Sequence, residues 1–322
     1  MSEPTTTVPD YGSIDEVLRR ELAQGDAQIA SIAPILRHLL ANDEHSVFGD
    51  EIIARVRAML AHIASQLLDA LAEAGEEDDE RNHDPVRVES LVEGLAGQGS
   101  FLTHAHALAL EWQLTERLQA RLALDPVVSP LMQALIASTE ANVSAGAMSL
   151  LAQQARFAQS QRRMQLPLEE LPADLFHAAL LALRHHGELD DAAQAIAAQA
   201  EQVIRGRYDE GRSRLGLITR LVAGMGGGAS AALSVTHAGA GIFLTALSMA
   251  SGQDRDLAVL ATNESQVARF ALALRASGLK PQSIEEQFVA LHPEVELPQG
   301  FDQLGADRAA AMLAHSAAYP GG

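Results

Sequence analysis

The stretch from Ser129 to Arg163 most constrains the fold, because it has the length and composition of one unusually long helix. Ser129 followed by Pro130 is typical of a helix start, since a serine oxygen can accept a hydrogen bond from an unpaired backbone N–H and proline has no N–H that would need a partner. No proline follows before Pro167, and the last turns carry arginines that suit the negative end of a helix dipole. At 1.5 Å per residue this helix would be about 52 Å long. We therefore expect a central rod on which other helices pack.

The rest of the chain also favours helices over strands. Hydrophobic residues make up 48% of the 322 residues but aromatic residues only 4%, so the core must come chiefly from Leu, Ala, Val and Ile. Ala and Leu are the best helix formers, whereas the residues preferred in strands are sparse. A chain of this length exceeds one usual core. The predicted fold class is all-α, a multi-helix array of two helical subdomains, with a HEAT-like arrangement as one form and the long helix at its centre.

Charge runs and helix signals divide the chain into segments. A capping box at Ser13–Glu16 predicts a helix that stops near Gly25, followed by a second helix over 27–40 with a kink at Pro34. Apolar residues at helical spacing predict a third helix over 50–74. The predicted organisation is a disordered tail at 1–12, an N-terminal helical segment at 13–75, an acidic linker at 76–86, a helical subdomain at 87–187 with the long helix 129–163, a C-terminal helical subdomain at 188–315, and a tail at 316–322.

Two segments resemble one another at a separation of 124 positions. Residues 135–152 align with residues 259–276, and the matches include Ala137 with Ala261 and Glu140 with Glu264. Such matches arise easily in helices rich in Ala and Leu. A duplication, which would indicate repeat architecture, is therefore one of two open explanations.

The segment from Gly241 to His292 resembles the C-terminal part of an uncharacterised alphaproteobacterial family of helical, HEAT-like proteins, a domain of unknown function. The likeness lies in the FLTAL motif with Phe243, Ala246 and Leu247, in Gly252, in the ALRASGL motif at 273–279, and in Phe288. The resemblance covers about a sixth of the chain. It implies a helical fold and brings no catalytic residues and no cofactor.

Charge and cysteine content exclude several classes of function. The net charge is −19, from 42 acidic and 23 basic residues, and such a field repels nucleic-acid phosphates. The absence of cysteine removes disulfides, thiolate nucleophiles and Cys-ligated zinc. The first residues show neither the basic nor the apolar region of a secretion signal, so a cytoplasmic location is expected. We expect no cofactor and no nucleic-acid partner.

Histidines suggest a metal site only weakly. His104 and Glu111 share one helix face, whereas His104 and His106 point in nearly opposite directions. No HExxH or ExxH pair supplies the usual metal spacing. A metal-binding enzyme or sensor that uses His104, Glu111 and His237 stays open as an alternative, although structural or surface histidines are the simpler explanation.

The stretch from Leu221 to Ala250 lacks acidic residues, lysine and arginine, and suggests two further functions. Residues 224–229 fit the GxGxxG/A dinucleotide pattern, but the pattern needs a preceding strand and a helix is predicted there. Glycines interrupt the apolar run, so the stretch lacks the roughly twenty continuous apolar residues of a membrane span. We expect no membrane insertion. A pocket for an apolar small molecule built around this stretch is a second alternative.

The leading hypothesis is a non-enzymatic, cytoplasmic helical module that binds an unidentified protein partner and self-associates. It follows from the acidic surface, the long rod and the absence of a recognisable catalytic constellation. Small residues in the middle of the long helix would allow another helix to approach closely. We therefore predict a homodimer with Ala141, Ala145 and Met148 at its contact.

Overall fold

A computed structural model describes residues 14–41, 50–75, 84–186 and 191–316 of the chain. Within these ranges the protein consists of fourteen α-helices and five short 3-10 helices, with no β-strand. The predicted all-α fold is confirmed. The two predicted tails up to Gly12 and after Ser316, and residues 76–83 of the predicted acidic linker, lie outside the described residues.

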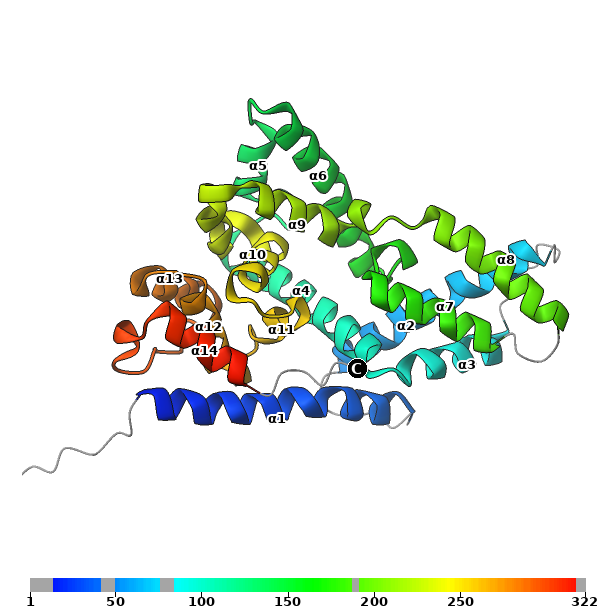
Figure 1. Cartoon of the computed structure of the whole chain (residues 1–322), viewed down its shortest axis with the longest axis horizontal. Helices are drawn as coiled ribbons and strands as arrows, with labels where there is room; N and C mark the ends of the chain where they lie inside the picture. Colours follow the sequence, from blue (N-terminus) through cyan, green and yellow to red (C-terminus); the bar gives the residue numbers. More distant parts are fainter. Residues whose placement is uncertain (1–13, 42–49, 76–83, 187–190, 317–322) are drawn as a thin grey trace, which may run out of the picture.

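The first four helices are α1 (Ile14–Ala41), α2 (Asp50–Ala74), α3 (Pro85–Ala96) and α4 (Gly99–Leu122). The prediction of two helices before residue 41 is wrong, because α1 continues through both Gly25 and Pro34 and runs along the lower edge of the molecule, beneath α14 and α4, in Figure 1. Gly25 serves close packing and not helix termination. Its carbonyl oxygen accepts a hydrogen bond from Gln266 Nε2 at 2.9 Å, and a β-carbon there would lie 2.4 Å from Gln266 Oε1.

The predicted single helix over 129–163 is also wrong, because two helices replace it: α5 (Pro130–Ile136) and α6 (Ala141–Arg162). Its start is correct, since Ser129 Oγ accepts a hydrogen bond from the Met132 N–H at 3.2 Å. The break follows from hydroxyl groups that compete for backbone bonds. Ser138 Oγ accepts from the Glu140 N–H at 3.2 Å, and Ser144 Oγ donates to the Ile136 carbonyl at 2.7 Å. These bonds stabilise a turn in place of a continuous rod.

The remaining elements complete the helical array (Figure 1). In chain order they are η1 (Leu168–Glu170), α7 (Ala173–His186), α8 (Asp191–Arg207), η2 (Glu210–Arg212), α9 (Arg214–Gly224), η3 (Gly226–Leu233), α10 (Val235–Ser251), α11 (Arg255–Leu260), η4 (Glu264–Gln266), α12 (Val267–Ala276), α13 (Pro281–Leu291), η5 (Phe301–Gln303) and α14 (Ala306–His315). Within α10 the backbone bends at Gly239, whose φ of 75° is a conformation that other residues rarely adopt. The glycine-rich stretch begins at the last residue of α9 and continues into the 3-10 helix η3, so a helix and not a strand precedes it.

The two similar segments have the same local structure. Ala137 and Ala261 are the C-caps of α5 and α11. A short turn then leads into α6, and a turn with the 3-10 helix η4 leads into α12. The aligned residues therefore share a helix–turn–helix outline, with the break at the matching position. This agreement is compatible with a duplication, and the HEAT-like arrangement stays a prediction.

Two hydrophobic core clusters lie side by side and share three helices. The first cluster gathers the start of α1, the end of α4, the start of α6 and the helices α9, α10, α12, α13 and α14. The second gathers the end of α1, the start of α4, the end of α6 and the helices α2, α3, α7 and α8. Within α6, for example, Leu150 belongs to the first cluster and Phe157 to the second. Helices α1, α4 and α6 thus join the two cores.

Candidate functional site

A buried charged cluster lies where α4, α9 and α11 meet, and the predicted candidate Glu111 is at its centre. Glu111 is 1% exposed. Its Oε1 accepts a hydrogen bond from Arg214 Nη1 at 2.7 Å, and its Oε2 accepts one from Arg214 Nη2 at 3.1 Å. Arg255 Nη2 donates to the same Oε2 at 2.8 Å. One carboxylate therefore neutralises part of the charge of two arginines that come from distant parts of the chain.

Local helix geometry positions the two arginines. Arg214 is the first residue of α9, because Ser213 caps this helix by accepting the Gly216 N–H. Arg255 is the first residue of α11, which Asp254 caps through the Asp256 and Leu257 N–H groups. Both arginines therefore extend from helix starts whose backbones are fixed by capping.

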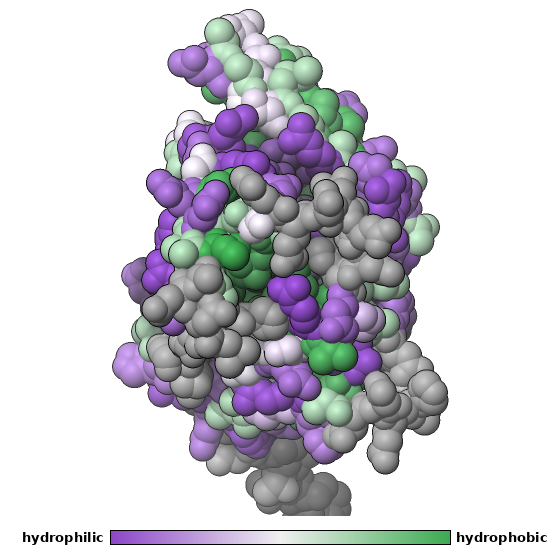
Figure 2. All heavy atoms as spheres, turned by 90° about the vertical axis from the view of Figure 1, so that its right-hand side faces the viewer, coloured by the Kyte–Doolittle hydropathy of each residue, from purple (hydrophilic) through white to green (hydrophobic). Residues whose placement is uncertain are grey.

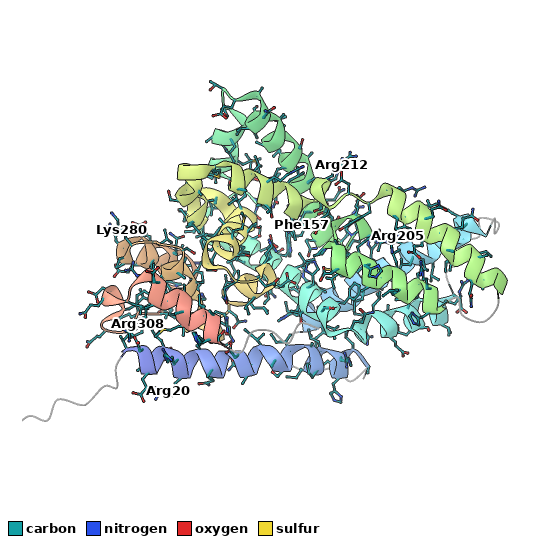
Figure 3. All side chains as sticks on the ribbon, in the orientation of Figure 1. Arg20, Phe157, Arg205, Arg212, Lys280 and Arg308 are labelled. Carbon is teal, nitrogen blue, oxygen red and sulfur yellow. The ribbon has the colours of Figure 1, made fainter. Side chains whose placement is uncertain are left out.

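Aromatic packing and a glycine enclose the cluster. The Arg214 guanidinium carbon lies 3.5 Å from the centroid of the Phe157 ring, a cation–π contact, and Trp112 meets the same ring edge-on. Figure 3 shows Phe157 near the middle of the molecule. Gly241 allows α10 to approach, because a β-carbon there would lie 2.9 Å from Arg214 Nη1 and 3.2 Å from Glu111 Oε1.

His104 extends the cluster along the same face of α4, as predicted from its spacing to Glu111. The Nδ1 atom of His104 lies 2.8 Å from Oδ2 of Asp256, which is the residue after Arg255 in the sequence. Burial alone would raise the pKa of Asp256, but His104 and Arg255 outweigh that effect and hold the pKa below its usual value. His106 points away from this pair, and burial lowers its pKa to about 4, so it is neutral at physiological pH.

The charges of the cluster suit a structural role, the attachment of three helices to one another, better than a catalytic role. Burial by itself would raise the pKa of Glu111, but the guanidinium groups of Arg214 and Arg255 together lower it to about 2. A general acid or base works best with a pKa near the operating pH and with access to substrate. Glu111 has neither property, since it is ionised, buried and bonded on both oxygens. It fixes α4, α9 and α11 relative to one another.

The structure does not assemble the three candidate metal ligands into a site. No group of three or more His, Asp or Glu residues with the geometry to hold a metal ion occurs in the described ranges. His104 and Glu111 have the partners given above. His237 is a partly buried residue of α10 that precedes the bend at Gly239, and its N–H donates to the Ser234 carbonyl.

Sequence reasoning missed Arg214, Arg255, Asp256 and Gly241. One signal was present for a buried pair: Glu111 is the only acidic residue in the otherwise mostly apolar stretch 99–115, and a charge in such surroundings needs a partner.

An apolar groove of about 510 Å³ lies between the α5–α6 pair and α9 with η3. Its walls come from Leu135, Val143, Leu217, Leu221 and Met225. The groove includes the beginning of the 221–250 stretch that suggested an apolar pocket, whereas Ala240 to Leu247 are buried in the core. The groove volume is within the ~300–1,000 Å³ range of small-molecule sites.

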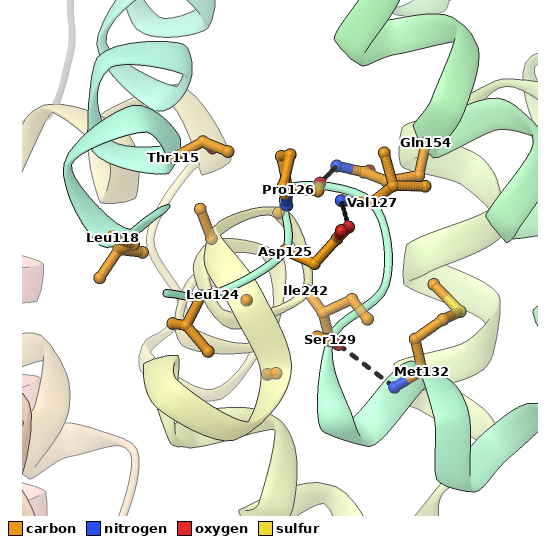
Figure 4. Close-up of a pocket in the computed structure, with 14 residues that line it drawn as sticks. Thr115, Leu118, Leu124, Asp125, Pro126, Val127, Ser129, Met132, Gln154 and Ile242 are labelled. Atoms are coloured by element: carbon orange, nitrogen blue, oxygen red, sulfur yellow. Dashed lines mark hydrogen bonds between the residues drawn. The ribbon is translucent and has the colours of Figure 1, made fainter. Parts of the chain in front are cut away.

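A second cavity, beside the bend of α10, is too small for such a ligand. Its volume is about 30 Å³, and the loop between α4 and α5 forms part of its wall (Figure 4). Asp125 Oδ1 accepts the Val127 N–H at 2.8 Å, and Gln154 Nε2 donates to the Pro126 carbonyl at 3.0 Å. These bonds hold the loop against α6. We therefore interpret the cavity as a packing feature.

The three predicted contact residues lie on the outward face of α6. Ala141, Ala145 and Met148 are all exposed, and Met148 has 52% of its surface accessible. The α5–α6 pair projects from the body of the molecule in Figure 1, and its tip stands above the rest in Figure 2.

Comparison of the chain with protein-family models, curated proteins and solved structures gives no significant match. The resemblance of residues 241–292 to a HEAT-like family therefore stays a prediction. Among the described residues, no single helix is long and apolar enough to span a membrane. The helices η3 and α10 meet that criterion only as a pair, and they are bent by 109° relative to one another.

Proposed function

We propose that the protein is a non-enzymatic helical interaction module that self-associates through the outward face of α6. The observation that supports this proposal is a row of exposed residues along α6: Ala141, Ala145, Met148, Ala152 and Ala155. Their spacing of four, three, four and three residues places them on one side of the helix, as in the contact face of a coiled coil. Figure 1 shows the α5–α6 tip projecting from the body, where a partner can reach it.

The chemistry of this face suits a second copy of the same helix. Small side chains allow two helices to approach closely, and Met148 at the middle supplies apolar area. The contact face itself carries no charged residue, so two copies can meet there without like-charge repulsion. The same face could instead receive a helix of another protein, so binding and self-association use one surface.

Light scattering after size-exclusion chromatography tests the proposal. The wild-type protein should have the mass of a dimer, and Ala145→Glu should be monomeric, because pairing would then bury a charge in the contact of each copy. Ala198→Glu is the matched control, since Ala198 is an exposed alanine of α8 away from this face. It should remain dimeric. Circular dichroism checks that both variants fold. A monomeric wild type would rule out self-association, and a folded Ala145→Glu dimer would exclude this face as the contact.

A further inference from the structure

We propose that the groove between the α5–α6 pair and α9 binds a medium-chain fatty acid, with its carboxylate on Arg220 and its alkyl chain along the apolar walls. This inference does not depend on the proposed self-association. Val143 and Gly146 of α6 line the groove, whereas Ala145 and Met148 lie on the outward face.

The direction of the groove follows from the pairing of α6 with α9. A β-carbon on Gly146 would lie 3.3 Å from Leu221 Cδ2, and Gln153 Nε2 donates to the Arg212 carbonyl at 3.1 Å. Later residues of α6 therefore face earlier residues of α9, so the two helices run antiparallel. Gly146 and Leu221, which lie close together, both line the groove.

The two charged residues of the groove lie toward opposite ends. Arg220 reaches back toward the start of α9, where its guanidinium donates to the Gly211 carbonyl. Glu140 precedes α6 and, by the antiparallel pairing, lies toward the η3 end. A single anionic head group is therefore favoured at the Arg220 end and disfavoured at the Glu140 end. An exposed arginine with further free N–H positions can receive a carboxylate in a bidentate manner.

The walls between these ends suit an unbranched alkyl chain. Leu217 and Leu221 from α9 face Val143 from α6, and Met225 adds a flexible side chain. Gly224 and Gly228 leave open space, because a β-carbon on either would meet no atom within 4 Å. A single alkyl chain that runs parallel to α9 can contact the apolar side chains of both helices along its length.

Isothermal titration calorimetry with a series of saturated fatty acids, kept below their micelle concentrations, tests the assignment. Affinity should rise about fourfold for each added methylene from hexanoate to decanoate, because each buried methylene adds a constant increment. Affinity for decanol should be lower by about tenfold or more, since the alcohol lacks the charged contact with Arg220.

Three variants distinguish the groove from adventitious binding. Arg220→Met should weaken decanoate binding about tenfold and leave decanol binding unchanged. Gly224→Leu should weaken both, since its side chain would enter the groove. Arg212→Met is the control and should change neither affinity, because Arg212 is exposed and is not one of the residues that line the groove.

Absence of decanoate binding, or an Arg220→Met variant that binds decanoate like the wild type, would overturn the assignment. Equal weakening by Arg212→Met would do the same. The outcome is separate from the light-scattering test: a monomer that binds decanoate contradicts only self-association, and a dimer that does not bind it contradicts only the groove.

Discussion

Replacement of Glu111 by glutamine should cost a large part of the stability of the protein. The substitution keeps the shape of the side chain but leaves the guanidinium groups of Arg214 and Arg255 without their shared counter-ion, at side-chain exposures of 1% and 14%. The pKa of Glu111 falls from 4.5 to about 2 in the folded protein, which corresponds to roughly 3 kcal/mol at 1.36 kcal/mol per pH unit. Removing one partner of a buried ion pair typically costs about 3–5 kcal/mol. The two figures agree, so we expect a loss of roughly 3–5 kcal/mol at pH 7.

Urea unfolding followed by circular dichroism measures this loss. Glu116→Gln is the matched control, because Glu116 is an exposed glutamate on the same helix and should change the free energy of unfolding by less than about 0.5 kcal/mol. The double variant Glu111→Met with Arg214→Met should be more stable than Glu111→Met alone, since it removes one of the two guanidinium groups that Glu111→Met leaves without their counter-ion. A loss below about 1 kcal/mol for Glu111→Gln would refute the assigned role of the cluster.

The pH dependence of the same proteins gives an independent check. Because the folded-state pKa of Glu111 lies below the unfolded-state value, its contribution to stability is complete above pH 4.5 and is lost as the pH falls toward 2. Glu111→Gln has no carboxyl group to titrate at this position. Its stability should therefore fall less steeply than that of the wild type across this window, and equal slopes would contradict the pairing of Glu111 with Arg214 and Arg255.

Helical periodicity predicted the local structure well where one face of a helix is buried. The apolar residues predicted to line one face of 50–74 include Val56, Met59 and Ile63, and the structure buries all three completely in α2. The pattern succeeds because helix period and burial impose the same constraint on each turn. The ends of helices were harder to predict than their buried faces, and α1 is an example. A glycine and a proline normally indicate a break, yet α1 continues through the exposed Pro34 and through Gly25, where close packing against Gln266 outweighs that local tendency.

The sequence between α5 and α6 contains a local turn signal, but the alanines around it favour a continuous helix. Ser138, Thr139 and Glu140 form a turn through a serine hydroxyl, but the surrounding alanines favour a helix. The aligned residues Thr262, Asn263 and Glu264 contain a clearer turn signal, since asparagine at position 263 caps η4. If the internal similarity is interpreted as a helix break common to both segments, it predicts that the stretch 129–163 divides into two helices.

The partners of the buried cluster could not be obtained from local pattern. Arg214 is 103 positions from Glu111 in sequence, and Arg255 is 144 positions away. Helical spacing places His104 and Glu111 on one face of α4, which the structure confirms, but it carries no information on which distant helix covers that face. Single-sequence reasoning thus indicates that a buried acid needs a cation and leaves open which of the 23 basic residues supplies it.

Further substitutions test the packing around this cluster. Gly241→Ala should lower the melting temperature, because the new β-carbon would lie 2.9 Å from Arg214 Nη1. Gly94→Ala is the control: a β-carbon at this position of α3 meets no atom within 4 Å, so the free energy of unfolding should rise by about 0.5–1 kcal/mol. A more stable Gly241→Ala protein would contradict the close approach of α10. His106 supplies the last test. Burial lowers its pKa from 6.5 to about 4, so the unfolded chain takes up a proton before the folded protein does, and the wild type should lose roughly 3 kcal/mol as the pH falls through this window. His106→Leu cannot take up this proton, so its urea midpoint should fall less between pH 7 and about pH 4.5. Equal losses in both proteins would show that the histidine is not held neutral by burial.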